Sequence, residues 1–173
     1  MQRRTALKNV ASTIGAFVAL PAWANGWNRQ QLSNNALLNP AENSLLAEVV
    51  ETIIPKTDTP GAKELGVHQF VQTMITDCYD KKAQDSLVSG LASLDAFSQS
   101  TFGKSFTACS AKQRIHILEG MELSDDAARK SFYGMVKGLT IQGYMSSEYV
   151  MTNLTHYEMI PGRFHGCVPV KTT

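Results

Sequence analysis

The sequence predicts an all-α fold: an irregular bundle of about five to six helices with an extended C-terminal segment. Three observations support this fold class. Apolar residues recur at helical spacing in several stretches, residue pairs typical of helix N-termini precede some of them, and no stretch alternates apolar and polar residues as a half-buried strand does. With 173 residues, 43% of them hydrophobic, the chain has enough apolar material for one domain with a core.

The first predicted helix begins after Asn39 and ends before Pro55. Asn39 can act as the N-cap, Pro40 suits the first helical position, and Glu42 follows the cap by three residues, as in a capping box. The apolar residues behind this start recur at spacings of one, three and four; they are Leu45, Leu46, Val49, Val50, Ile53 and Ile54. This spacing predicts one broad buried face.

Two more helices are expected after the turn-rich stretch KTDTPGAKELG, residues 56–66. The first spans residues 67–79, with a buried face of Val67, Phe70, Val71, Met74, Ile75 and Cys78. The second spans residues 81–101, and its inward positions are Leu87, Leu91, Leu94 and Phe97. Gly103 can end it, because glycine readily adopts the left-handed conformation that follows many helices.

The remaining helices are predicted from three serines. Ser110 forms a capping-box pair with Gln113 and starts a helix whose inward residues are Ile115, Leu118 and Met121. Ser124 is expected to cap a helix over residues 125–144, with the core positions Phe132, Met135, Val136 and Leu139. Ser146 is expected to cap a last short helix in SSEYVMTNL, residues 146–154.

The N-terminus has the layout of an export signal. A basic start with Arg3 and Arg4 precedes a short apolar run, which is followed by Ala22 and Ala24 as an Ala-x-Ala cleavage site. The paired arginines favour the twin-arginine route, although Ala6 stands where that motif usually has phenylalanine. The alternative is a helical N-terminus of a cytosolic protein.

The chain is therefore expected to have three parts. Residues 1–24 are the signal, residues 25–39 a polar arm, and residues 40–173 the helical domain. Because the twin-arginine route carries folded proteins, we expect a periplasmic location and a folded cargo.

Few residue patterns in this chain are typical of catalytic, cofactor-binding or nucleic-acid-binding sites. The net charge of +1 and the lack of a Lys/Arg cluster give no reason to expect nucleic acid. A glycine-rich nucleotide loop and a haem-attachment motif are both missing from the sequence. We therefore predict no catalytic residue, cofactor or metal in this chain. The alternative is a helical metal-binding protein or enzyme that uses His116, Glu119, His156 and Glu158.

Three cysteines leave two interpretations open. In an exported protein, Cys78, Cys109 and Cys167 suggest one disulfide and one remaining thiol, and the sequence does not choose the pair. The alternative is three buried free thiols.

The C-terminal stretch MIPGRFHGCVPV, residues 159–170, combines prolines and glycines with residue types enriched at protein interfaces. Such a segment either docks on a partner or covers its own bundle. The predicted contact residues are Tyr144, Tyr149, Tyr157, Pro161, Arg163, Phe164 and His165.

Three stretches resemble a known family: TIIPKTDTPGAKELGVHQFV (residues 52–71), FYGMVKGLTIQGYMSSE (132–148) and YEMIPGRFHGCVPV (157–170). Together with the paired arginines, they resemble the gluconate 2-dehydrogenase subunit 3 family, small subunits of exported flavin-dependent sugar and polyol dehydrogenases. The resemblance implies a non-catalytic subunit whose catalytic partner holds FAD. It also implies a multi-haem cytochrome c that passes electrons to the membrane, and escort of the folded partner through the twin-arginine translocase.

Overall fold

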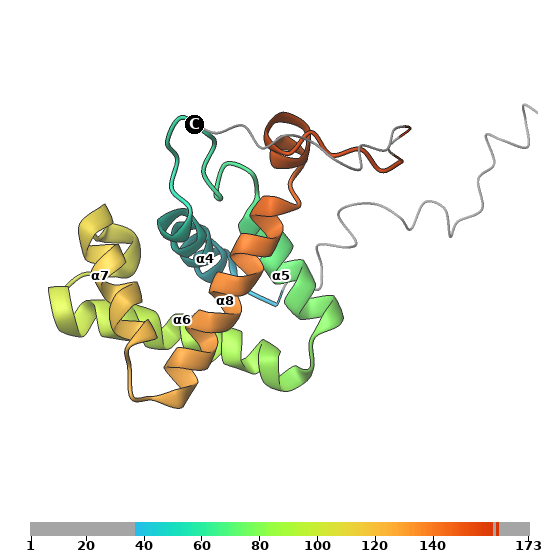
Figure 1. Cartoon of the computed structure of the whole chain (residues 1–173). Coiled ribbons are helices and arrows are strands. Elements are labelled where there is room, and N and C mark those ends of the chain that lie inside the picture. Colours follow the sequence, from blue (N-terminus) through green and yellow to red (C-terminus); the bar gives the residue numbers. More distant parts are fainter. Residues whose placement is uncertain (1–36, 161, 163–173) are drawn as a thin grey trace, which may run out of the picture. The chain divides into compact units, whose positions relative to one another are not determined.

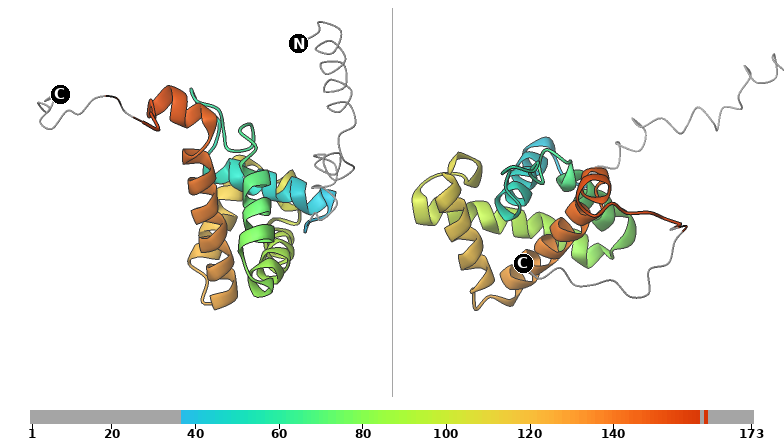
Figure 2. Two further views of the ribbon diagram at one scale, coloured as in Figure 1. Left: turned by 90° about the vertical axis from the view of Figure 1, so that its right-hand side faces the viewer. Right: turned by 45° about the horizontal axis from the view of Figure 1, so that its top comes forward.

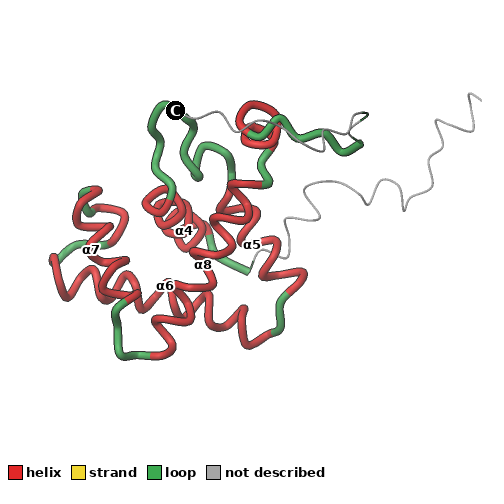
Figure 3. The backbone as a smooth tube through the Cα atoms, viewed as in Figure 1, coloured by secondary structure: helices red, strands yellow, loops and turns green. Residues whose placement is uncertain are grey.

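The computed structural model describes residues 37–160 and 162. Five α-helices, a 3-10 turn and a π-helix lie within these residues, joined by loops and without a strand (Figure 3). The predicted all-α fold is confirmed. The compact unit that contains these elements begins at Leu38, which is buried. The predicted signal and most of the polar arm lie outside the described residues.

Helix α4 (Pro40–Ile53) begins with the predicted capping box. The Glu42 amide donates to the Asn39 side chain at 2.9 Å, and the Asn39 amide donates to the Glu42 carboxylate at 2.9 Å. Most of the predicted apolar face is buried: Leu45, Leu46, Val49 and Val50. The helix ends one residue earlier than Ile54 because that residue leaves the helical conformation before Pro55.

Helices α5 (Val67–Cys78) and α6 (Lys81–Phe102) follow as predicted. Gly103 ends α6 in the left-handed conformation, at φ +66°. The prediction that Cys78 is buried is wrong, because its side chain is exposed. Cys78 lies on the predicted face but is the last residue of α5, where the backbone turns away in an extended conformation at Tyr79.

The 3-10 turn η2 (Phe106–Ala108) leads into α7 (Ala111–Glu122), which starts with the predicted Ser110–Gln113 capping box. Ile115 is 48% exposed, so its predicted core role is wrong, and Ile117 is fully buried instead. On a helical wheel Ile117 lies about 40° from Met121, whereas Ile115 lies about 120° from it. The buried stripe around Met121 therefore includes Ile117 and leaves Ile115 at its edge.

Helix α8 (Ala127–Met145) packs against α4, α5, α6 and α7. Figure 1 shows it crossing in front of α6, and the left view of Figure 2 shows it at one side of the bundle next to α5. Its cap is Asp126, which accepts a 2.9 Å hydrogen bond from the Ala128 amide; the predicted cap, Ser124, instead accepts one from the Asp126 amide. The phenyl ring of Phe132 fills the space beside Gly90 of α6, where a Cβ would lie 2.1 Å from the ring.

The chain after α8 forms a short π-helix, η3 (Val150–Leu154). The predicted cap Ser146 ends α8 instead, and the neighbouring Ser147 starts the next turn by accepting a hydrogen bond from the Val150 amide. The short final helix is thus present, but its cap is shifted by one residue.

Candidate partner interface

The C-terminal end of α8 and the loop of residues 54–66 are joined through one tyrosine. Tyr144 is only 8% exposed, and its hydroxyl donates to the Pro60 carbonyl at 3.0 Å. The loop and η3 both lie at this end of α8 (Figures 1 and 2). The predicted contact role of Tyr144 is therefore corrected: its ring lies inside the domain, where it holds the loop in place.

The 54–66 loop is organised around the carboxylate of Glu51 in α4. One carboxylate oxygen accepts from the Lys56 amide at 3.0 Å, and the other accepts from the Lys63 amide at 2.9 Å. Gly61 lies directly over this carboxylate, where a Cβ would come within 2.4 Å of an oxygen. Because residue 61 has no side chain, the loop backbone can lie against this carboxylate; a Cβ there would displace the carboxylate from its two amide donors.

An ion-pair network fixes the same loop to α7. Glu48 of α4 accepts hydrogen bonds from the Lys63 ammonium and from the Arg114 guanidinium. The Lys63 hydrogen bond and the charge of Arg114 lower the pKa of Glu48 below its ordinary value of 4.5, although partial burial opposes them. The Arg114 guanidinium also donates to the Thr107 carbonyl at 2.7 Å, so it connects three elements.

The end of η3 redirects the chain. The Thr155 amide donates to the Val150 carbonyl at 2.9 Å, and the Tyr157 amide donates to the Met151 carbonyl at 2.8 Å. Between them, His156 adopts a positive φ of 48°, a conformation that costs a non-glycine residue free energy. These two hydrogen bonds hold the reversal and determine the direction of the residues that follow.

Large apolar side chains are exposed along this redirected stretch. We define the apolar segment as Leu154, Tyr157, Met159 and Ile160, whose exposed fractions are 50%, 58%, 82% and 86%. A soluble protein rarely exposes so many large apolar residues within seven positions unless they meet a partner. This segment is the strongest candidate interface in the described part of the chain.

The predicted contact residues have different positions in the structure. Tyr157 belongs to the apolar segment, and Tyr149 is half-buried at the start of η3. Pro161, Arg163, Phe164 and His165 lie outside the described residues. Met159 and Ile160 are not among the predicted contact residues, although two adjacent large apolar residues beside Pro161 are a usable signal.

The alternative metal site is not assembled. His116 is exposed on α7 and packs edge-on against Phe102, with the ring centroids 6.0 Å apart. Glu119 is exposed one turn along the same helix, whereas His156 and Glu158 follow η3. Within residues 37–160, no group of three or more His, Cys, Asp or Glu side chains is arranged to hold a metal ion.

Among the described residues, Cys78 and Cys109 are free thiols and do not pair with each other. Cys109 is buried beside the Ser98 hydroxyl, at 3.3 Å from sulfur to oxygen, while Cys78 is exposed. Cys167 lies outside the described residues, so the interpretation of three buried thiols fails at Cys78.

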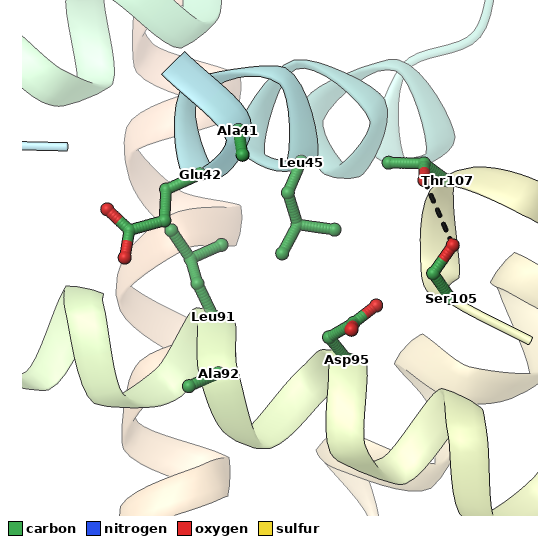
Figure 4. A pocket seen from close by; sticks show the side chains of 8 residues that line it. All are labelled: Ala41, Glu42, Leu45, Leu91, Ala92, Asp95, Ser105 and Thr107. Atoms are coloured by element: carbon green, nitrogen blue, oxygen red, sulfur yellow. Dashed lines mark hydrogen bonds between the residues drawn. The ribbon is translucent and has the colours of Figure 1, made fainter. Parts of the chain in front are cut away.

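In two shallow hollows of the described surface, the polar groups serve the local fold. One, of about 350 Å³, lies beside Glu48, Glu51, Lys63 and Glu64. The other, of about 290 Å³, lies between α4 and α6 (Figure 4). In the second hollow, Asp95 accepts hydrogen bonds from the Phe106 amide at 2.9 Å and the Gln99 side chain at 2.8 Å. Its carboxylate is therefore already engaged within the domain.

A comparison with known families identifies the family of this chain. Residues 40–162 match the family model of gluconate 2-dehydrogenase subunit 3. The chain belongs to this family. The match includes two of the stretches in which the resemblance was noted, residues 52–71 and 132–148, and it extends through the apolar segment. No curated protein and no solved structure matches the chain significantly.

Membership of the gluconate 2-dehydrogenase subunit 3 family makes the chain a subunit of a dehydrogenase complex, with catalytic subunits as partners. Among the described helices, none is both long enough and apolar enough to span a bilayer.

Proposed function

We propose that this chain is the non-catalytic small subunit of a membrane-associated, FAD-dependent sugar or polyol dehydrogenase complex, and that it assembles with, stabilises and escorts the catalytic flavoprotein. The observation that carries the proposal is the apolar segment, on a chain whose family assembles with catalytic subunits. Burying Met159 and Ile160 against a partner would remove the largest exposed apolar side chains of this region from water.

In this proposal the chemistry resides in the partners. FAD belongs to the catalytic subunit, and haem c belongs to a multi-haem cytochrome subunit that passes electrons to the membrane. The acidic side chains that line the two hollows support this division, because Glu48, Glu51 and Asp95 all bind groups of their own domain.

The proposed export role assigns a task to the N-terminal residues. Arg3 and Arg4 direct the small subunit, with its folded partner attached, to the twin-arginine translocase, and cleavage after Ala24 releases the complex into the periplasm. Because the signal is removed, substitutions at Arg3 and Arg4 leave the mature subunit unchanged.

The test is to co-express the catalytic subunit of the complex with either the wild-type chain or the Arg3→Lys/Arg4→Lys variant. Dehydrogenase activity and flavin absorbance are then measured in the cytoplasmic and envelope fractions. We expect both signals in the envelope with the wild type and in the cytoplasm with the variant. The proposal fails if the catalytic subunit reaches the envelope equally well with the variant, or if it never co-purifies with this chain.

A second experiment addresses assembly through the terminal stretch. Replacing Arg163 or Phe164 by Ala is expected to weaken the complex by about 2 kcal/mol if either residue is a central anchor. Titration of the purified catalytic subunit with each variant measures the loss, and unchanged affinity for both variants removes these two residues from the interface.

A further inference from the structure

One ring nitrogen of His68 is buried without a partner. Three buried side-chain atoms in the described part of the chain make no hydrogen bond: Asn43 Oδ1, Arg129 Nε and His68 Nδ1. Of these groups, only the imidazole gains or loses a proton near neutral pH. In an imidazolium both ring nitrogens carry protons, and the proton on Nδ1 would be buried with no acceptor among the described residues.

The position of His68 gives a second reason why a positive charge is unfavourable there. His68 is the second residue of α5, a helix whose N-terminus has no side-chain cap. The free amides of a helix N-terminus carry partial positive charge, so they disfavour a cation in the first turn. The preceding residue, Val67, is buried, and a Cβ added at Gly143 of α8 would lie 3.1 Å from its side chain. The imidazole therefore lies beside a tightly packed contact between two helices.

The charge nearest in effect to His68 is also positive. Burial lowers the pKa of His68 below its ordinary value of 6.5, and the charge of Lys63 in the preceding loop lowers it further. The Glu48 carboxylate of α4 is bound to the Lys63 ammonium, and the Glu51 carboxylate is bound to two loop amides. Neither of these carboxylates forms an ion pair with His68.

The other elements around the start of α5 offer no compensating charge in the described structure. In the loop, Lys56 and Glu64 are paired with each other at 2.8 Å. Helix α8 has no charged residue from position 138 to its end at position 145, and its Tyr144 hydroxyl donates to the Pro60 carbonyl. Asp58 in the loop and Asp77 near the far end of α5 are exposed. An imidazolium at position 68 would therefore lack an anionic partner among these groups.

We propose that His68 makes the junction between the 54–66 loop and α5 sensitive to pH: the imidazole is neutral in the folded domain, and its protonation in mild acid loosens this junction and lowers the stability of the domain. The junction is closed by the Val67 amide, which donates to the Ala62 carbonyl at 3.0 Å, and by the Gly66 amide, which donates to the Lys63 carbonyl at 3.1 Å. The loop lies at the same end of α8 as η3 (Figure 1).

The pH range of the effect follows from the direction of the shift. Because the pKa of His68 is lowered in the folded state, the unfolded chain binds more protons in mild acid. The contribution of the neutral imidazole to stability is therefore complete above pH 6.5 and decreases as the pH falls from there toward the lowered pKa. This range lies above the one in which Glu48 takes up a proton, since the ordinary pKa of Glu48 is 4.5 and is also lowered.

Nuclear magnetic resonance of the full-length chain measures the protonation of His68 directly. The imidazole C–H signal of His68 is the one that disappears in His68→Gln, and its chemical shift is followed from about pH 8 to about pH 5. We expect a titration midpoint below 6.5. A midpoint at or above 6.5 would overturn the proposal, because some group of the chain would then stabilise the imidazolium. If His68→Gln does not fold, through-bond assignment of the wild type identifies the same signal.

Urea denaturation measures the consequence for folding. Relative to His68→Gln, the unfolding equilibrium constant of the wild type should rise at least about twofold between about pH 7 and about pH 5. His116→Gln is the matched control, because it removes an exposed histidine, and it should follow the wild type. Equal pH dependence of the wild type and His68→Gln would overturn the proposal.

Hydrogen exchange tests whether the junction is the part that loosens. Between about pH 7 and about pH 5, protection of the Val67 amide, corrected for the intrinsic exchange rate, should fall by a larger factor than that of Leu91, which is fully buried in α6. Equal losses of protection at the two amides would overturn the assignment to the junction.

Discussion

The 54–66 loop and the apolar segment, Leu154 to Ile160, are both irregular and lie at the same end of the bundle, but they differ in what their groups contact. The loop binds the Glu51 carboxylate, the Tyr144 hydroxyl and, through Lys63, the Glu48 carboxylate. In the apolar segment, Met159 and Ile160 direct most of their surface to solvent. Irregular backbone can therefore serve the domain in one place and a partner in another.

This difference shows that two stretches matched by the same family model can have different roles. One maintains the fold of the domain, and the other is available to bind a partner. The stretch of residues 52–71 carries turn residues with internal roles: Gly61 makes room for Glu51, and the Pro60 carbonyl accepts a hydrogen bond from Tyr144. Residues 157–160 have few such internal roles. We therefore expect substitutions in the loop to reduce folding stability, and substitutions in the apolar segment to reduce assembly.

The largest expected effect is a glycine substitution in the loop. Gly61→Ala would push its Cβ into the Glu51 carboxylate and break the hydrogen bonds to the Lys56 and Lys63 amides, so we expect a loss of about 3 kcal/mol of unfolding free energy. Gly162→Ala is the matched control, because a Cβ there would meet no atom of the described residues within 4 Å. Urea denaturation of both variants measures the difference, and similar stabilities would contradict the internal role of the loop.

The second prediction concerns the apolar segment. Met159→Ser/Ile160→Ser should leave the unfolding free energy within about 0.5 kcal/mol of wild type and weaken the complex by about 2 kcal/mol. Leu123→Ser is the control, because Leu123 is 81% exposed but lies between α7 and α8. Calorimetric titration with the catalytic subunit compares the two variants. Equal binding by both would remove the apolar segment from the interface.

The third prediction uses the charge of Glu48. Glu48→Gln should cost about 1.5 kcal/mol at pH 7, because Arg114 is only 17% exposed and loses its charged partner. Since the folded-state pKa of Glu48 lies below 4.5, its contribution is present above that pH and is lost as pH falls through the lowered pKa.

The stability difference between wild type and Glu48→Gln should therefore shrink in acid, as measured by urea denaturation at pH 7 and at about pH 3. Glu122→Gln is the control, since the Glu122–Lys137 pair is much more exposed and contributes little. A difference that stays constant with pH would rule out the ionised pair as its source.

The smallest expected effect compares two tyrosines. Tyr144→Phe removes the hydrogen bond to the Pro60 carbonyl and should cost about 1 kcal/mol of unfolding free energy. Tyr157→Phe should leave the free subunit unchanged, since Tyr157 is exposed in the apolar segment. Thermal unfolding of the two variants tests this difference in stability. Equal shifts in Tm would contradict the internal role of the Tyr144 hydroxyl.

Local sequence signals predicted most of the helices, because their causes are local. Asn39 with Glu42 and Ser110 with Gln113 make their hydrogen bonds within one turn, so the residue types alone identify the starts of α4 and α7. Gly103 ends α6 for an equally local reason, its positive φ.

The wrong predictions concern positions where two neighbouring residues are nearly equal as helix caps, or where tertiary packing decides whether a side chain is buried. Serine and aspartate are comparable caps, so residue type alone does not favour Asp126 over Ser124. Cys78 shares the buried face of α5 but lies at its end, and no sequence pattern reveals where packing stops. Tyr144 resembles an interface residue by type, and only the folded loop shows that its hydroxyl is bound internally.

The π-helical geometry of η3 bears on how the chain before the apolar segment tolerates a change of length. The Thr155 amide donates to the Val150 carbonyl five residues back, so this turn holds one residue more than an α-helical turn. Five residues of such a turn and four residues of an α-helix both complete about one revolution. Deleting one residue between Val150 and Leu154 would therefore let the turn relax to α geometry while Tyr157, Met159 and Ile160 keep about the same direction. A deletion within α8 would instead rotate everything after it by about 100°, so the wide turn is where this chain can lose a residue at the least cost in orientation.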